Sequence, residues 1–166
     1  MLRSLYGLPV FGIAAGGAGP YTALMILELA IGTALIVSTI LVESLFIAGG
    51  VEILNRFVGA IRKRALSVRI GLSLSLAGLW SMIALVICVW MWAGCFLLVG
   101  EFVTVGEALY FTVVAFTTLG FGDVLLEEWR LLSGLCAANG LIIFSMITAF
   151  LLEVLQSVMA KDTQRL

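Results

Sequence analysis

The sequence has few charged residues and no histidine. Only 11% of its 166 residues are Asp, Glu, Lys or Arg, whereas a soluble domain carries about a quarter. Hydrophobic residues make up 63% of the chain. This composition excludes an ordinary soluble domain and predicts an integral membrane protein with little mass outside the bilayer. The formal net charge is −1, so no basic surface for nucleic acid is expected.

The residues that most often build metal, redox or catalytic sites are also scarce. The absence of histidine removes the commonest metal ligand. Cys88, Cys95 and Cys136 lie in or beside apolar stretches without a CxxC spacing, which argues against a metal site or a disulfide framework. They are most simply packing residues. We therefore expect no enzyme, no cofactor and no small-molecule substrate; the expected partner is membrane lipid.

Three apolar runs are long enough to span a bilayer, which takes about 20 residues. They cover residues 21–50, 71–100 (with the span itself at about 77–98) and 131–158. The pair Gly49-Gly50 is a plausible end for the first helix. Trp80, Trp90 and Trp92 in the second run are candidates for interfacial aromatic residues.

Two acidic residues interrupt the first run. Glu28 is expected near the outer interface, but Glu43 falls inside any reasonable span. A carboxylate within the membrane is costly and is by default a functional candidate. The alternative, which we prefer, is that Glu43 is protonated or hydrogen-bonded, for example through Ser38, Thr39 or Ser44.

The distribution of cations predicts the topology. One short connection contains five cations and one acid, namely Arg56, Arg62, Lys63, Arg64, Arg69 and Glu52. Such a bias places residues 51–70 in the cytoplasm, where apolar residues at helical spacing favour an amphipathic helix on the membrane surface. Residues 1–20 then form an outer leader and residues 159–166 a cytoplasmic tail. The expected location is the inner cell membrane, with the amino terminus outside and the carboxy terminus in the cytoplasm.

A short apolar segment precedes a glycine motif. Residues 107–118 are too few to cross the membrane and fit a re-entrant pore helix, whose C-terminal dipole would face an ion path. The chain continues as Thr117-Thr118-Leu119-Gly120-Phe121-Gly122-Asp123. Backbone carbonyls can replace the water around a dehydrated ion. For successive carbonyls to face the same way, every second residue must adopt backbone angles that a Cβ would oppose. Gly120 and Gly122 can adopt such angles. The Thr118 hydroxyl would close the innermost site, while Leu119 and Phe121 would point away and wedge against supporting helices.

This motif resembles the selectivity filter of potassium channels, Thr-Val-Gly-Tyr-Gly followed by Asp. The resemblance covers about 71–158 and is to prokaryotic channels that have one pore loop between two helices. The extra helix at 21–50 resembles the layout of the two-pore-domain-like ion channel group. The resemblance implies an all-α membrane protein, a homotetramer, and potassium bound at Thr118, Leu119, Gly120 and Phe121, with Gly122 completing the filter.

The resemblance also assigns roles around the filter. Tyr110 would hydrogen-bond Asp123 and, with Thr117, support the filter, and Gly140 would be a hinge. An outer mouth is expected at Asp123, Glu127 and Glu128, a cavity lining at Phe144, Thr148 and Leu152, and an inner mouth at Glu153. Two alternatives stay open: packing between subunits for the lining residues, and pairing with Lys161 or Arg165 for Glu153.

Three positions depart from the family pattern. Leu119 replaces valine, Phe121 replaces tyrosine and so lacks a hydroxyl, and Val114 stands where some relatives have a buried glutamate. No span has the regular cations of a voltage sensor. The sequence predicts a potassium-selective channel; the alternatives are a weakly selective cation channel and a non-conducting membrane scaffold or sensor. An active potassium-uptake subunit fits less well, because such chains have four pore loops.

Overall fold

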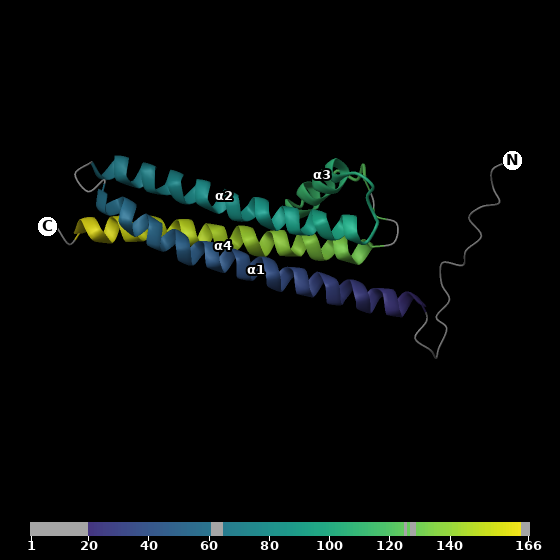
Figure 1. The fold of residues 1–166 in the computed structure, drawn as a ribbon. Coiled ribbons are helices and arrows are strands. Elements are labelled where there is room, and N and C mark those ends of the chain that lie inside the picture. The colour runs from purple at the N-terminus through teal and green to yellow at the C-terminus, as the bar shows by residue number, and fades with distance from the viewer. Residues whose placement is uncertain (1–19, 61–64, 125, 127–128, 164–166) are drawn as a thin grey trace.

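The computed structural model describes residues 20–60, 65–124, 126 and 129–163. These contain four helices, α1 (Pro20–Ala60), α2 (Leu66–Leu98), α3 (Val105–Phe116) and α4 (Arg130–Thr163) (Figure 1). The expected leader lies outside the described residues, except for Pro20 at the start of α1.

Three of these helices are long and apolar enough to cross a membrane. They are α1, α2 and α4, whose most apolar parts have mean hydropathies between 2.1 and 2.3. The prediction of three long apolar helices is confirmed. The second of them ends at Leu98, as expected, but begins at Leu66.

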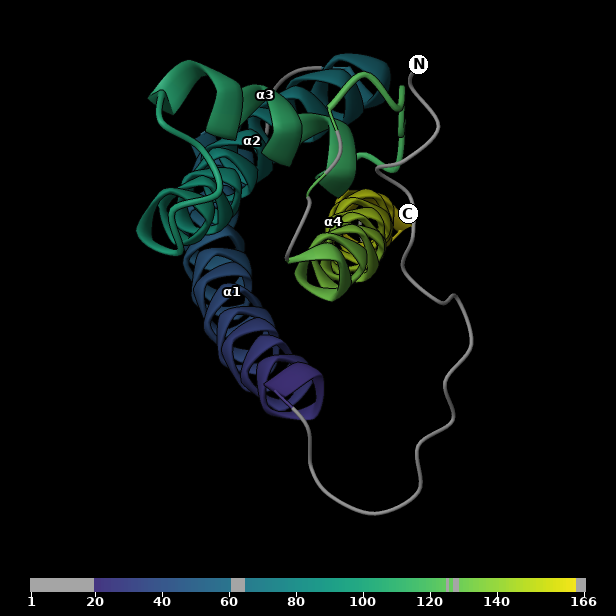
Figure 2. The same ribbon diagram turned by 90° about the vertical axis from the view of Figure 1, so that its right-hand side faces the viewer.

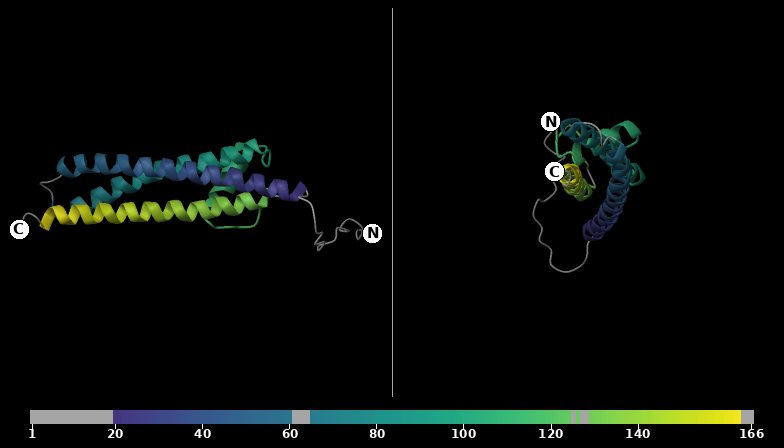
Figure 3. Two further views of the ribbon diagram at one scale, coloured as in Figure 1. Left: turned by 90° about the horizontal axis from the view of Figure 1, so that it is seen from below. Right: turned by 90° about the vertical axis from the view of Figure 1, so that its left-hand side faces the viewer.

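The long helices lie side by side, and α3 packs at one end of the bundle (Figures 1 and 3). Viewed from that end, α3 extends from beside α2 toward α4 (Figure 2). The first turns of α1 and α4 and the last turns of α2 lie at the α3 end. The last turns of α1 and α4 and the first turns of α2 lie at the opposite end. The motif is therefore separated by the length of the bundle from Arg56 and Arg69, the described cations of the cation-rich segment.

The prediction that the first helix ends at Gly49-Gly50 is wrong, because α1 continues to Ala60. A Cβ on Gly50 would lie 2.9 Å from side-chain atoms of both Phe150 and Trp80. The Trp80 indole also donates a hydrogen bond to the Phe46 carbonyl, at 2.7 Å. Close packing thus explains a glycine whose helix propensity is about 1 kcal/mol poorer than that of alanine. The first half of the expected connection at 51–70 is helical and continuous with α1.

One narrow stripe of α1 is buried, and we call it the α1 stripe. Among the described side chains of this helix, its members are Glu28, Gly32, Thr39, Glu43, Gly50 and Leu54. The spacings alternate between four and seven residues, an 11-residue repeat that keeps one face in line over the whole helix. A Cβ on Gly32 would lie 2.4 Å from the Leu135 side chain. The stripe therefore brings the backbone of α1 close to α4.

The interior of the bundle is rich in aromatic residues at the α3 end. Trp92 and Phe96 of α2 are fully buried, and the Phe96 ring lies 5.2 Å from Phe111 and 6.2 Å from Phe102. The expectation that Trp92 is interfacial is therefore wrong, although its neighbour Trp90 is exposed. Trp90 and Trp92 point to different sides of α2. The contacts that each side makes with other helices decide which of the two side chains is buried.

One cation of the connection lies inside the helical bundle. Arg69 belongs to the first turn of α2 and is 1% exposed. Arg69 therefore adds no exposed positive charge to the surface of the described structure. Arg62, Lys63 and Arg64 lie outside the described residues.

Candidate functional site

Helix α3 begins with a hydrogen-bonded cap. The Thr104 hydroxyl accepts a hydrogen bond from the Glu107 amide at 3.2 Å, and Glu107 places an acid in the first turn, where the helix dipole favours it. The helix ends at Phe116, and the Thr117 hydroxyl donates to the Val113 carbonyl at 2.6 Å. The short helix expected at 107–118 is therefore present, two residues earlier in the chain.

The motif that follows has an alternating backbone. Positive φ angles occur at Thr118 (58°), Gly120 (55°) and Gly122 (77°), whereas Leu119 and Phe121 between them have none. No atom lies within 4 Å of a Cβ built on either glycine. The requirement for glycine here is therefore conformational rather than steric, since L side chains disfavour positive φ. The backbone angles that the sequence analysis required at Gly120 and Gly122 are observed, and Thr118 extends the pattern by one step.

Residues 118–123 lie on the surface of the single chain. Leu119 is 58% exposed and Phe121 is 66% exposed, so the expectation that they wedge against supporting helices is not met within one chain. The amides of Thr118 and Leu119 donate to carbonyls of α3. Among the described residues, no donor hydrogen-bonds a carbonyl oxygen of 118–122. These oxygens are available to a ligand.

A hydrogen bond joins α3 to the end of the motif. The Tyr110 hydroxyl donates to Oδ2 of Asp123 at 2.7 Å. This bond raises the pKa of the Tyr110 hydroxyl above its ordinary value, and desolvation and the negative charge of Asp123 add to the effect. The contact between Tyr110 and Asp123 expected from the resemblance is therefore present. It holds the exit of the motif against the middle of α3.

Gly140 lets the C-terminal end of α3 approach α4. A Cβ on Gly140 would lie 1.8 Å from the Phe116 carbonyl oxygen, and the Phe116 ring lies 6.3 Å from Phe144. Because α4 is continuous through this position, the close approach explains the glycine without a bend. The hinge role stays a prediction. Sequence reasoning missed this contact, although small residues cluster from Cys136 to Gly140.

The residues proposed to line the cavity and the inner mouth are exposed on α4. Phe144, Thr148 and Leu152 follow each other at four-residue spacing and share one face, and the Thr148 hydroxyl donates to the Phe144 carbonyl at 2.8 Å. Glu153 is exposed beside them. Glu127, Glu128, Arg165 and the Lys161 side chain lie outside the described residues.

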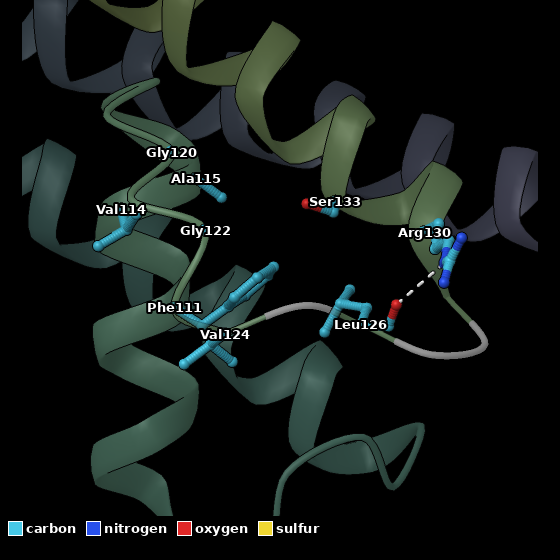
Figure 4. A pocket seen from close by; sticks show the side chains of 9 residues that line it. All are labelled: Phe111, Val114, Ala115, Gly120, Gly122, Val124, Leu126, Arg130 and Ser133. Atoms are coloured by element: carbon cyan, nitrogen blue, oxygen red, sulfur yellow. Dashed lines mark hydrogen bonds between the residues drawn. The ribbon is translucent and has the colours of Figure 1, made fainter. Parts of the chain in front are cut away.

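A pocket of about 410 Å³ separates the motif from the first turns of α4 (Figure 4). Its walls come from α3, the motif, the segment after it and α4: Phe111, Val114, Ala115, Gly120, Gly122, Val124, Leu126, Arg130 and Ser133. At one side of it, Nε of Arg130 donates to the Leu126 carbonyl at 3.2 Å (Figure 4). Val114, where some channels resembling this chain have glutamate, lines this pocket, and its apolar side chain offers the motif no hydrogen bond.

A contact that sequence reasoning missed joins α1 to the start of α4. Oε2 of Glu28 accepts a hydrogen bond from the Leu131 amide at 3.1 Å, and Glu28 is only 4% exposed. The carboxylate thus caps the N-terminal turn of α4, where the helix dipole favours negative charge. The expected depth of Glu28 near the outer interface stays a prediction; the structure adds that its carboxyl group lies between two helices.

Comparison with known proteins gives a match to the part of the chain that contains the motif. Residues 82–157 match the sequence model of a family described as ion channel. The match indicates an ion channel. Together with the three apolar helices it indicates a membrane protein and favours a non-enzymatic role. The matched segment contains the second half of α2, all of α3, the motif and most of α4, whereas α1 lies outside it. No curated protein and no solved structure matches the chain.

Proposed function

We propose that the chain is one subunit of a potassium-selective channel. Four copies would place residues 118–122 around a common axis, and potassium would pass through rings of carbonyl oxygens from Thr118, Leu119, Gly120 and Phe121. Conduction would be passive, because repulsion between ions at adjacent sites moves them along the file.

The observation that carries this proposal is the alternating backbone of the motif. A left-handed conformation at every second residue allows successive carbonyls to face the same side, and it occurs at Thr118, Gly120 and Gly122 directly after a short apolar helix. An isolated glycine turn needs no such alternation. Available carbonyl oxygens support the same function, because an ion can replace the missing donors.

The exposure of the motif supports assembly from several copies. One chain supplies one strand of carbonyls, which cannot surround an ion. The exposed Leu119 and Phe121 side chains are large apolar groups that neighbouring copies would cover. A closed ring is the expected arrangement for a heterologous interface of this kind, and four strands complete the filter in the channels that this motif resembles.

The depth of α3 supports a re-entrant pore helix. Its C-terminal end touches α4 at Gly140, and α4 begins ten residues earlier at Arg130. At about 1.5 Å per residue this is about 15 Å, half the thickness of the hydrocarbon core. The chain then returns to the end where it entered. With the cation-rich connection in the cytoplasm, the amino terminus and Asp123 would face outward.

The acidic residues would concentrate cations at both mouths. Asp123, Glu127 and Glu128 would act outside, and Glu153 inside, by electrostatic attraction. Phe144, Thr148 and Leu152 would line the inner cavity, in agreement with their exposure on one face of α4. A bend at Gly140 or a change in the filter would gate the pore.

Flux through reconstituted vesicles tests the proposal. We expect potassium to pass far faster than sodium. Equal flux of the two ions would favour a weakly selective cation channel, and no flux would favour a scaffold. Mass measurement of the detergent-solubilised complex should give four copies.

Substitution of one glycine tests the filter assignment. Gly122→Ala should assemble but lose conduction, because alanine disfavours the observed φ of 77°. Gly78→Ala is the matched control: Gly78 has ordinary helical geometry in α2, and the position that an added methyl group would take is open space. Unchanged conduction in Gly122→Ala would refute the assignment.

A further inference from the structure

Glu43 is a buried carboxyl group without a hydrogen-bond partner. It lies on the α1 stripe, is 1% exposed, and neither carboxyl oxygen has a partner among the described residues. It lies inside the apolar part of α1, Thr22–Leu54, about two thirds of the way along it. Buried polar groups in proteins are almost always hydrogen-bonded, so this exception requires an explanation.

The hydrogen bonds expected for Glu43 are not present in the described structure. The Ser38, Thr39 and Ser44 hydroxyls all donate to carbonyls of α1 itself. Thr39, one turn away, also accepts a hydrogen bond from the buried Asn139 amide of α4, at 2.8 Å. The hydroxyl donors beside Glu43 are therefore used within α1. The alternative that Glu43 is hydrogen-bonded is wrong, and the alternative that it is protonated stays a prediction.

Among the described residues, no cation interacts electrostatically with Glu43. Among the described helices, α1 packs against α2 and α4. From α2 the titratable neighbour is Cys88, which interacts electrostatically with Glu43, and its thiol lies 3.9 Å from the Thr39 carbonyl. From α4 the neighbouring polar group is Asn139, which is neutral. The nearest described acid on α1 itself, Glu52, is paired with Arg56.

An ionised carboxylate in this position would be both desolvated and unpaired, whereas the neutral acid loses far less on leaving water. We infer that Glu43 is a proton-binding site whose neutral form holds α1 against α2 and α4. Lipid does not solvate the ionised form, so Glu43 can ionise only when α1 moves far enough for water to enter between the helices. The docked state thus binds more protons than this open, hydrated state, so the docked state loses stability as pH rises.

The position of Glu43 connects this site to the rest of the bundle. The α1 stripe contacts α4 at Leu135 and Asn139, directly before Gly140, where α3 packs against the same helix. Release of α1 would remove support from α4 at the level of the motif. Only this last step rests on the proposed function; proton binding and helix docking do not.

Infrared spectroscopy of the full-length protein in lipid vesicles tests proton binding. The wild type should show the carbonyl band of a protonated carboxyl group at neutral pH. Glu43→Gln should lose this band, whereas the control Glu153→Gln, which removes an exposed carboxyl group from α4, should retain it. Identical spectra for the wild type and Glu43→Gln would overturn the inference, because Glu43 would then be ionised.

Thermal unfolding between neutral and alkaline pH tests the effect on docking. The unfolding temperature of the wild type and of Glu153→Gln should fall as pH rises, and Glu43→Gln should lose this part of the pH dependence. Glu43→Leu, an apolar replacement of similar size, gives a second test if the amide disturbs folding. A slope in both Glu43 variants equal to that of the wild type would overturn the inference.

Potassium flux provides a separate measurement. Alkaline conditions should reduce flux in the wild type and have less effect in Glu43→Gln. A chain that conducts no ions would refute the proposed function and still give the expected infrared and unfolding results. Failure of the two ideas can therefore be distinguished.

Discussion

Replacement of Gly140 by alanine should displace α3 from α4. The new Cβ would lie 1.8 Å from the Phe116 carbonyl oxygen, whereas an ordinary C···O contact is about 3.3 Å. The carbonyl would have to move by about 1.5 Å. It belongs to the last residue of α3, so it cannot move away as a flexible side chain can, and the whole end of the helix must shift.

The expected magnitude is the difference between two effects. Overpacking of a well-packed interior typically costs about 1–3 kcal/mol, and a rigid backbone contact belongs at the upper end. Alanine regains up to about 1 kcal/mol of helix propensity. We therefore expect a net loss of about 1–2 kcal/mol in the free energy of unfolding. Because the motif begins directly after Phe116, ion flux should fall more steeply than stability.

The matched control is Gly134→Ala, in the same helix. No atom lies within 4 Å of a Cβ on Gly134, so this variant should be neutral or up to about 1 kcal/mol more stable. Thermal unfolding and potassium flux of both variants should be measured together. Equal behaviour of the two would refute the packing argument. A hinge role alone predicts altered gating in Gly140→Ala with unchanged stability.

Three further predictions concern individual contacts. In an absorbance titration Tyr110 should ionise at higher pH in the wild type than in Asp123→Asn. Because the pKa of Tyr110 is raised, its hydrogen bond is present at neutral pH and is lost only as pH rises through that raised value. Glu28→Ala should lower the free energy of unfolding by about 1–2 kcal/mol by uncapping α4, with Glu28→Gln less affected; equal stability of the alanine variant and wild type would contradict the cap. Gly50→Ala should cost about 1–3 kcal/mol through overpacking, whereas Gly49→Ala, which has only one contact at 3.6 Å, should not; thermal unfolding of the pair decides between them.

The features that could be predicted from sequence are those fixed by local chemistry. The long apolar runs predicted three helices, because the bilayer sets a minimum length. The pattern from Thr117 to Asp123 predicted unusual backbone angles at Gly120 and Gly122, which a side chain would oppose, and both angles are observed. The bounds of α3 were two residues off, because the Thr104 cap was not recognised.

The features that were missed depend on contacts between distant segments. A glycine pair in the first run looked like a helix end, but Gly50 makes room for Trp80 and Phe150. The charge of Glu28 indicated an interface, although its carboxylate caps a helix that begins about a hundred residues later. Hydropathy alone cannot distinguish a glycine that ends a helix from one that admits a neighbour, nor an exposed acid from a buried cap.

The 11-residue repeat of the α1 stripe has a consequence for how α1 tolerates change. An insertion of one residue between Thr39 and Gly50 would turn everything beyond it by about 100°, so that Gly50 and Leu54 would both leave the buried face of α1. An insertion of 11 residues would restore the face but move it by about 16 Å along the bundle. The repeated positions hold different residues, because Glu28, Thr39 and Gly50 stand 11 apart and each fits only its own partner on the neighbouring helices. Sliding α1 by one repeat would pair none of them correctly, so the sequence of this one helix specifies a single height for it in the membrane.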